Sequence, residues 1–172
     1  MVFTVTEIST AKAEDSKVGS RPIVRECEVM YVSSAPSEHL EEYLEAIYLI
    51  QEAGEPRAKI TAISQRLNVS PPSSVQMLRR LEKEGYVKYI PREGVELTGK
   101  GKELGRRMVR NGRLTEVLMK DTFRIPIDGR VACGIEHHMT DAFADALCTM
   151  LNHPRTCPHG HPIPQGKCCT SR

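Results

Sequence analysis

The 172-residue sequence predicts a mostly α-helical fold with one small β-hairpin. Two short runs of alternating apolar residues, Tyr86–Ile90 and Val95–Thr98, flank the turn residues Pro91–Gly94 and indicate a pair of strands. Apolar residues also recur at helical spacing in four segments, which are residues 37–53, 59–84, 98–121 and 131–151. The fold class is therefore mainly helical, with the hairpin between the second and third of these segments.

Composition limits the class of protein. No apolar run reaches the roughly eighteen residues that a transmembrane helix needs, and the N-terminus lacks the pattern of a signal peptide. Six cysteines, three of them in the last sixteen residues, are distributed like thiols and metal ligands rather than like a disulfide framework. We therefore expect a cytoplasmic protein that contacts neither a membrane nor a small-molecule substrate.

The first helix is expected to begin after Ser37, a residue type that caps helices, and to end near Ala53, before Gly54. Residues 1–36 precede it. They show no sustained period and contain prolines, which is typical of a flexible extension, with one short strand at Ile23–Val32.

Two short helices with a tight turn between them follow. The first covers Lys59–Leu67, and the second runs from Pro71 to Glu84. Ser70 followed by proline is a strong helix start, because proline lacks the N–H that would have no partner there. Two helices in this arrangement form a helix-turn-helix, and the hairpin that follows makes it a winged helix. We expect this DNA-binding domain to span residues 37–101.

The second of these helices carries side chains that suit DNA contacts. Gln can pair with adenine, Arg contacts guanine or phosphate, and Ser contacts a base edge or a phosphate. From Arg57 to Arg113 there are fourteen Lys or Arg against five Glu, a net charge of +9, which favours a polyanion. A solvated charged face is the alternative. The predicted DNA contacts are Ser70, Pro72, Ser73, Ser74, Gln76, Arg79, Arg80 and, in the hairpin, Arg92.

Two longer helices complete the predicted fold. Residues 98–121 form a basic helix in which we expect a kink or break near Gly112, because glycine weakens a helix. Residues 131–151 form the second. Together they have more apolar faces than a small winged helix buries, so we expect them to form the interface of a homodimer. The helical domain is assigned residues 102–153, and a Cys/His-rich tail residues 154–172.

Three chemically distinct side chains meet on the last helix. Cys133, Glu136 and His137 share one face, because helical residues three and four apart are neighbours. Thiolate, carboxylate and imidazole together suit a transition-metal ion rather than Ca²⁺ or Mg²⁺. On the first helix, Glu42 and Glu45 could face one partner. A buried cysteine beside a surface Glu-His pair is the alternative interpretation.

A cysteine nucleophile is a further alternative, with Cys133 attacking and His137 as its base. Such a nucleophile needs an oxyanion-stabilising loop and a third orienting group, and neither is evident. We therefore expect that the protein is not an enzyme.

The end of the chain is dense in metal-binding side chains. Such density in a cytosolic protein favours a metal site, whether structural Zn²⁺ or an Fe–S cluster, or else redox-sensitive thiols. A flexible tail is the alternative. The residues are Cys148, His153, Cys157, His159, His161, Cys168 and Cys169.

Five motifs follow one another along the chain, which are Glu42–Tyr48, Val69–Val75, Leu97–Gly101, Cys133–His138 and Gly160–Pro164. Their order is that seen in the diphtheria-toxin-repressor family of metal-dependent regulators, which the chain resembles over about residues 37–165. The resemblance implies a dimeric winged-helix repressor of transcription. It would bind double-stranded operator DNA when loaded with Fe²⁺ or Mn²⁺ and control metal homeostasis genes.

The resemblance also implies the metal ligands. Cys133, Glu136 and His137 match ligands of the family's main site, and Glu42 falls where the first helix contributes one. Glu45 matches an additional carboxylate of manganese-responsive members. Cys133 is typical of iron-responsive members and Glu42 of manganese-responsive ones. The mixture leaves the metal open, with Fe²⁺ slightly favoured.

The sequence departs from the family at its second metal site. The usual histidines fall at Gly112 and Gly129, and Glu116 alone remains of that site. A second metal would therefore need other ligands, which the tail could supply. The alternative function is a winged-helix regulator with structural metal or redox-sensing cysteines, whose DNA binding does not depend on metal supply.

Overall fold

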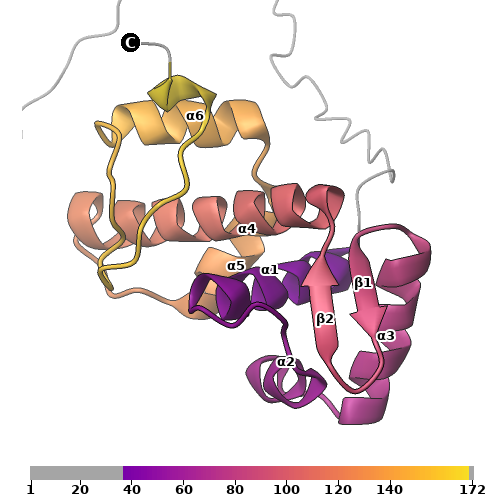
Figure 1. Cartoon of the computed structure of the whole chain (residues 1–172). Coiled ribbons are helices and arrows are strands. Elements are labelled where there is room, and N and C mark those ends of the chain that lie inside the picture. Colours follow the sequence, from indigo (N-terminus) through magenta and orange to yellow (C-terminus); the bar gives the residue numbers. More distant parts are fainter. Residues whose placement is uncertain (1–36, 171–172) are drawn as a thin grey trace, which may run out of the picture. The chain divides into compact units, whose positions relative to one another are not determined.

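Helix α1 (Glu38–Glu52) lies between the two halves of the fold (Figure 1). The computed structural model describes residues 37–170, so the flexible extension and the strand predicted within residues 1–36 lie outside the described residues. α1 packs against α4 (Gly99–Val117) and against α2 (Ile60–Leu67). No helix within the described part of the chain is long and apolar enough to cross a bilayer.

The winged helix-turn-helix is present as predicted. α2 ends at Asn68, whose left-handed backbone (φ 52°) turns the chain toward α3 (Pro71–Lys83). The side chain of Ser70 caps α3 by accepting a hydrogen bond from its backbone. Strands β1 (Val87–Ile90) and β2 (Gly94–Leu97) then pair antiparallel to form the wing.

A single hydrophobic core joins α1, α2, α3 and the wing. Each large apolar side chain that is fully buried contributes about 1.5–3 kcal/mol to folding. Because one core includes all four elements, the position of α3 is tied to that of α1. Its fully buried members include Leu44, Ile47, Ile63, Leu78, Leu81 and Val95.

The predicted kink at Gly112 is absent, because α4 continues without a break to Val117. Beyond it the helix widens into a π-helical turn, η1 (Leu118–Thr122), which the sequence analysis missed. Gly112 has another role. A β-carbon at this position would lie 2.2 Å from Glu136 Oε2, so the glycine leaves room for that carboxylate.

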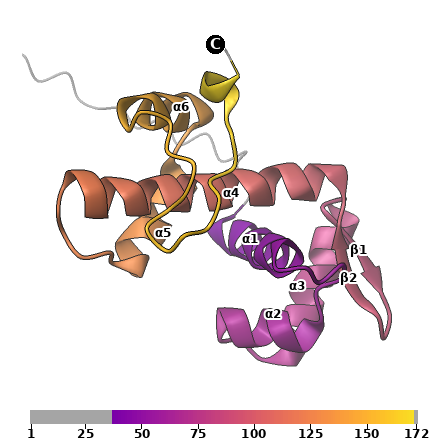
Figure 2. The ribbon, with the colours of Figure 1, turned by 60° about the vertical axis from the view of Figure 1, so that its left-hand side comes forward.

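The prediction of one helix over residues 131–151 is wrong. The chain forms two helices instead, α5 (Gly129–His138) and α6 (Asp141–Met150). Met139 between them has an extended backbone, and the Thr140 side chain caps α6. The break places α5 and α6 on opposite sides of α4 (Figure 2).

A buried asparagine of α4 holds this break in place. Asn111 Nδ2 donates to the backbone carbonyls of Glu136 (3.2 Å) and Met139 (3.3 Å), and its side chain is fully buried. The last carbonyls of a helix have no partner within the helix. Asn111 supplies a donor to the Met139 carbonyl and a second donor to the Glu136 carbonyl, which also accepts from the Met139 backbone N–H at 3.3 Å, and so it fixes the end of α5 against α4.

Residues 152–170 form a C-terminal arm that folds back over α4 (Figure 2). Arg106 Nη1 donates to the Gln165 carbonyl at 2.7 Å, and Arg113 donates to the Pro162 carbonyl. The arm contributes to a second hydrophobic core with α4 and α6. It ends in a short 3₁₀ turn, η2 (Lys167–Cys169), that includes two cysteines. The arm thus has a defined path, unlike the flexible tail considered as an alternative.

Candidate metal centre

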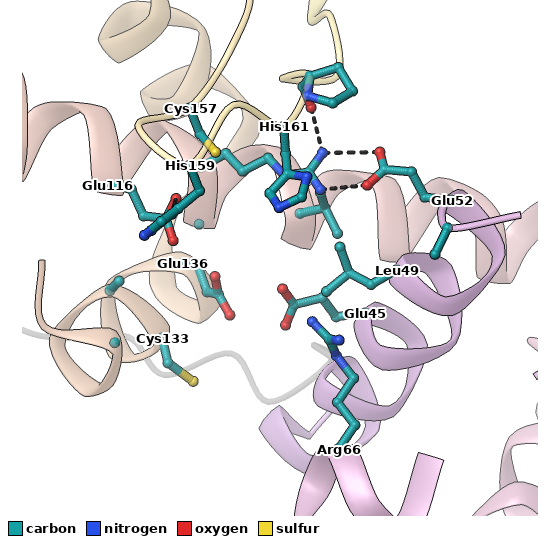
Figure 3. A pocket seen from close by; sticks show the side chains of 17 residues that line it. Glu45, Leu49, Glu52, Arg66, Glu116, Cys133, Glu136, Cys157, His159 and His161 are labelled. Carbon is teal, nitrogen blue, oxygen red and sulfur yellow. Dashed lines mark hydrogen bonds and ion pairs between the residues drawn. The ribbon is translucent and has the colours of Figure 1, made fainter. Parts of the chain in front are cut away.

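A pocket of about 620 Å³ lies between α1, α4, α5 and the arm (Figure 3). The carboxylates of Glu45 and Glu136 point toward one another across it. Seven of the predicted metal-binding residues line this pocket, and they come from segments far apart in the sequence. The residues are Glu45, Glu116, Cys133, Glu136, Cys157, His159 and His161.

Three of the predicted ligands come together where α1 meets α5. Glu42, Cys133 and His137 each offer a ligand atom, and these atoms lie within 4.8 Å of one another. Metal bonds to such atoms are about 2.0–2.3 Å long, so ligand atoms on one ion lie up to about 4.6 Å apart. A small adjustment would therefore let a single ion bind all three.

The imidazole of His137 is oriented by a neighbour that the sequence analysis missed. His137 Nδ1 lies 2.8 Å from Glu41 Oε2, and this hydrogen bond raises the pKa of His137. The other ring nitrogen, Nε2, is buried and has no hydrogen-bond partner among residues 37–170. Nε2 lies 3.8 Å from Glu136 Oε1, which is too far for a hydrogen bond. A histidine with one nitrogen on a carboxylate and the other without a hydrogen bond is the usual arrangement of a metal ligand. The site therefore fits a metal ion.

Glu41 itself is held by Arg107 of α4, whose Nη2 donates to Glu41 Oε1 at 3.0 Å. Its side chain is only 4% exposed, although acidic side chains are seldom buried without a partner. The sequence does contain a signal, since Glu41 precedes Leu44 by three residues and borders the apolar stripe of α1. Arg107, Glu41 and His137 thus connect α4, α1 and α5.

Negative charge accumulates around Glu136. Burial raises its pKa, and the nearby carboxylates of Glu45 and Glu116 raise it further. Burial also raises the pKa of the Cys133 thiol, with a contribution from Glu136, to about 11. A divalent cation would offset this repulsion and stabilise the thiolate.

Glu116 lies in a second group rather than in the first. Its Oε2 is 3.2 Å from His159 Nδ1, and Cys157 Sγ completes a set of ligand atoms within 4.8 Å of one another. This set joins the helix residue that matches the family's second site to two residues of the arm.

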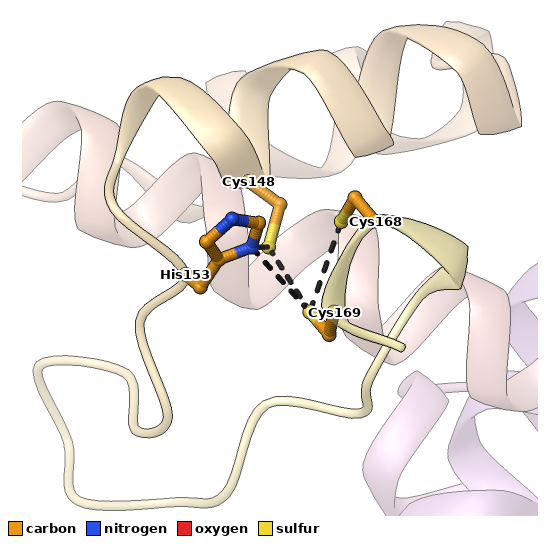
Figure 4. A group of neighbouring side chains, drawn as sticks. All are labelled: Cys148, His153, Cys168 and Cys169. Atoms are coloured by element: carbon orange, nitrogen blue, oxygen red, sulfur yellow. Dashed lines mark hydrogen bonds between the residues drawn. The ribbon is translucent and has the colours of Figure 1, made fainter. Parts of the chain in front are cut away.

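The seven residues of the tail do not form one site. Cys168 and Cys169 are grouped with Cys148 and His153 instead (Figure 4). His161 lines the main pocket and belongs to none of the ligand groups found in residues 37–170. The single tail site suggested by the sequence is therefore divided between two places.

Seven of the eight predicted DNA contacts are exposed on α3, at its N-cap or at the tip of the wing. Ser74 is the exception, because its side chain is fully buried. Its hydroxyl accepts a hydrogen bond from Ser64 at 2.9 Å and lies 3.4 Å from Tyr43 Oη. Ser74 therefore holds α3 against α1 and α2 and is not available to DNA. The exposed residues are Ser70, Pro72, Ser73, Gln76, Arg79, Arg80 and Arg92.

Part of the positive charge of residues 57–113 is neutralised by ion pairs within the protein. Arg107, Arg110 and Arg113 of α4 form ion pairs with Glu41, Asp145 and Glu52. These three arginines hold helices and the arm together. The net charge of the segment therefore overstates the charge offered to a polyanion.

Comparisons with known proteins match both halves of the chain. Residues 36–95 match the family described as "Iron dependent repressor, N-terminal DNA binding domain". Residues 98–165 match "Iron dependent repressor, metal binding and dimerisation domain".

Two curated relatives are each 35% identical to this chain. The iron-dependent repressor IdeR of Mycobacterium tuberculosis (strain ATCC 25618 / H37Rv) aligns over 126 residues, which are 72% of this chain and 54% of IdeR. The HTH-type transcriptional regulator MntR of Lysinibacillus sphaericus (strain C3-41) aligns over 127 residues, which are 69% of this chain and 88% of MntR. The chain thus spans about half the length of IdeR. Both relatives are named as regulators, which disfavours the cysteine-nucleophile alternative.

A solved structure of the manganese regulator SloR has the same fold. It superimposes with a TM-score of 0.65 at 33% identity and covers 74% of this chain and 60% of its own. The sequence motifs, the winged helix with its helical partner domain and these matches agree: the chain belongs to the iron-dependent repressor family.

Proposed function

We propose that this protein is a metal-dependent transcriptional repressor that acts in the cytoplasm. It binds double-stranded operator DNA as a homodimer when Fe²⁺ or Mn²⁺ occupies the metal centre, which consists of Glu42, Cys133, Glu136 and His137. The observation that carries the proposal is the approach of ligand atoms from two different helices, α1 and α5. The proposal is also supported by the similarity to IdeR, which is named an iron-dependent repressor, and to SloR, which is named a manganese regulator.

The shared ligand set gives a physical route from metal to DNA. Glu42 lies on α1, which shares a core with the recognition helix α3. Cys133 and His137 lie on α5, which packs on α4. When Glu42 and His137 hold one ion, α1 is fixed relative to α5, and α3 is fixed with it. Such coupling typically amounts to about 1–3 kcal/mol, because a ligand shifts an equilibrium only by its differential affinity for the two states.

The donor set favours Fe²⁺ over Mn²⁺ for this centre. The Cys133 thiolate is a soft ligand, and divalent ions at mixed nitrogen and sulfur sites bind in the order Mn²⁺ below Fe²⁺. Glu42 and Glu45 add the hard oxygen atoms that Mn²⁺ prefers. We therefore expect both ions to activate the protein, with Fe²⁺ the more effective.

DNA recognition is assigned to α3 and the wing. Gln76 and Arg79 would read base edges in the major groove, while Arg92 at the wing tip would contact phosphate. In a two-fold symmetric dimer, the two α3 helices would enter successive major grooves about 34 Å apart.

Exposed apolar side chains favour the homodimer. Large apolar side chains that stay exposed on a folded chain are candidates for an interface. Those exposed on α5 and α6 and in the segment that leads into α5 are Phe123, Ile125, Val131, Ile135, Phe143 and Met150.

The experiment is selection from a random duplex DNA library with chelator-stripped protein, without metal and with anaerobic Fe²⁺ or Mn²⁺. One of the ions should tighten binding to the selected sequence at least tenfold. His137→Gln should abolish that gain, whereas Glu38→Gln, an exposed change at the start of α1, should retain it. If DNA affinity is high and neither metal nor His137→Gln changes it, the result would instead favour a regulator without metal-dependent switching.

A further inference from the structure

Four metal-binding side chains converge at the junction of α6 and the C-terminal arm (Figure 4). Helix α6 lies on the other side of α4 from α5 (Figure 2). Cys148 comes from α6, His153 from the turn after it, and Cys168 and Cys169 from η2 at the end of the arm. Their ligand atoms lie within 4.8 Å of one another. None of these residues belongs to the metal centre proposed to control DNA binding.

Four of the six distances among these ligand atoms are those of a tetrahedral zinc site, and the other two are no longer than 4.8 Å. Cys169 Sγ lies 3.7 Å from the sulfur of Cys148, from the sulfur of Cys168 and from Nδ1 of His153. Cys148 Sγ is likewise 3.7 Å from His153 Nδ1. Zinc bonds of about 2.3 Å to sulfur and 2.0–2.1 Å to nitrogen place tetrahedral ligands about 3.8 Å (S to S) and 3.6 Å (S to N) apart. The observed distances agree with both values.

A disulfide does not account for the cluster. The sulfur atoms of a disulfide are about 2.05 Å apart, whereas these lie at 3.7 Å, and the three cysteines are free thiols. Three sulfur ligands and one imidazole fill all four positions of a tetrahedral zinc ion. Four protein ligands are typical of structural zinc sites.

The turn after α6 is shaped to return the histidine to the cluster. Asn152 and His153 both have left-handed backbones, with φ of 60° and 53°. Residues other than glycine rarely adopt this conformation, and it persists where surrounding contacts require it. The backbone N–H of His153 donates to the Cys148 carbonyl at 2.8 Å, which holds the imidazole beside the thiol.

A buried arginine supplies the opposite charge. Three thiolates around Zn²⁺ leave one net negative charge. Arg110 Nη2 lies 3.3 Å from Cys168 Sγ and 2.7 Å from Asp145 Oδ1, and the Arg110 side chain is 6% exposed. Gly166 makes this approach possible, because a β-carbon there would lie 2.2 Å from Arg110 Nη2. Hydrogen bonds to the ligands from such outer groups are typical of metal sites.

We propose that Cys148, His153, Cys168 and Cys169 bind one structural Zn²⁺ that fastens the C-terminal arm to α6. Binding converts three thiols to thiolates and releases their three protons to solvent, with no change of oxidation state. The arm passes over the main pocket and contributes Cys157 and His159 to its lining. The zinc site therefore anchors the arm near its end and is separate from the proposed sensor centre.

The first test is the metal content of the full chain, purified anaerobically and dialysed against a chelator of moderate strength. Wild type should retain one zinc more per chain than Cys169→Ser. Thr149→Ala is the control, since Thr149 follows Cys148 on α6, is exposed and belongs to none of the ligand groups found in residues 37–170, so this variant should keep that zinc. Equal zinc content in wild type and Cys169→Ser, or loss of zinc in Thr149→Ala, would overturn the proposal.

Replacement of the ion by Co²⁺ tests the ligand set directly. The spectrum should show the ligand-field bands of a tetrahedral site together with thiolate-to-cobalt charge transfer. Cys169→His should retain a tetrahedral spectrum with weaker charge transfer, which separates loss of a ligand from loss of the fold. An iron–sulfur absorption spectrum in the purified protein, or a disulfide among these cysteines under anaerobic conditions, would also contradict a zinc site.

Limited proteolysis tests the anchoring role. Arg155 lies exposed in the arm, and trypsin should cleave there at least tenfold faster in Cys169→Ser than in wild type or Thr149→Ala. Equal rates in Cys169→Ser and wild type would show that the cluster does not fasten the arm.

Discussion

At the scale of single residues, Gly112 is the position where a small change should separate sensing from folding. An alanine at Gly112 would place its β-carbon against Glu136 Oε2 and displace that carboxylate, although alanine favours the helix by about 1 kcal/mol. We predict that Gly112→Ala keeps the melting temperature within a few degrees of wild type. The metal-induced gain in DNA affinity should fall at least tenfold, measured by fluorescence anisotropy.

Gly129→Ala is the matched control for that substitution. No atom beyond its chain neighbours lies within 4 Å of a β-carbon at Gly129, so this change should leave the metal response intact. An unchanged response in Gly112→Ala would show that the position of the Glu136 carboxylate does not matter.

The second prediction at this scale concerns the effect of Glu41 on metal affinity. Glu41 accepts a hydrogen bond from Arg107 and orients His137 without belonging to the ligand set. Loss of such an outer partner typically costs about 10–100-fold in metal affinity. Glu41→Gln should therefore weaken Fe²⁺ binding by that factor in an anaerobic competition titration. Glu38→Gln should not change it, and equal affinities for the two variants would contradict the role given to Glu41.

At the scale of elements, the sequence predicts what short-range patterns determine. Ser70 before proline marks the start of α3, and the alternating runs around Pro91–Gly94 predict both strands of the wing. In the helix-turn-helix, the apolar stripes identify the buried faces, but Ser74 is buried in place of an apolar residue because its hydroxyl finds partners on α1 and α2.

The break between α5 and α6 shows where such patterns fail. The helical spacing of apolar residues continues across the break through Ile135, Met139 and Phe143, and this spacing predicts one helix. Thr140 is a capping residue, and that local signal competes with the period. The outcome depends on Asn111, which is distant in sequence and pairs with the carbonyls at the end of α5. Contacts of this kind are not encoded in local sequence.

Asn111 therefore carries a prediction about stability. Its removal takes the donor from the Met139 carbonyl and leaves the Glu136 carbonyl with only the Met139 backbone N–H, which costs about 1–3 kcal/mol. Asn111→Ala should lower the free energy of unfolding by that amount in urea denaturation. Thr140→Ala, which removes only the cap of α6, should cost about 1 kcal/mol. A loss for Asn111→Ala no larger than that for Thr140→Ala would contradict this account of the break.

At the scale of the whole molecule, the five motifs predict the family and the two-helix ligand set. They do not predict how the arm divides its ligands, because that depends on the path of residues 152–170 across α4. They also do not reveal that arginines of α4 pair with Glu41, Asp145 and Glu52. Charge counted along a sequence cannot distinguish internal ion pairs from a DNA-binding surface.

The proposed dimer gives a prediction at this scale. Ile135 and Phe143 are 40% and 57% exposed, and a carboxylate at either position would have to be desolvated in an apolar interface. Ile135→Glu or Phe143→Glu should therefore yield a monomer in analytical ultracentrifugation. Val69→Glu changes an apolar residue of similar exposure in the turn before α3 and should remain dimeric. If both Ile135→Glu and Phe143→Glu remain dimeric, the interface lies elsewhere.

The measurement that tests the central claim most directly is the Fe²⁺ affinity of the full chain with and without saturating operator DNA. Coupling between two sites is reciprocal, so DNA must raise metal affinity by the same factor by which metal raises DNA affinity. The account predicts a factor of at least about ten, or 1.4 kcal/mol, in both directions, and its loss in His137→Gln. Metal affinity that is identical with and without operator DNA would contradict the claim that an ion shared by α1 and α5 controls DNA binding.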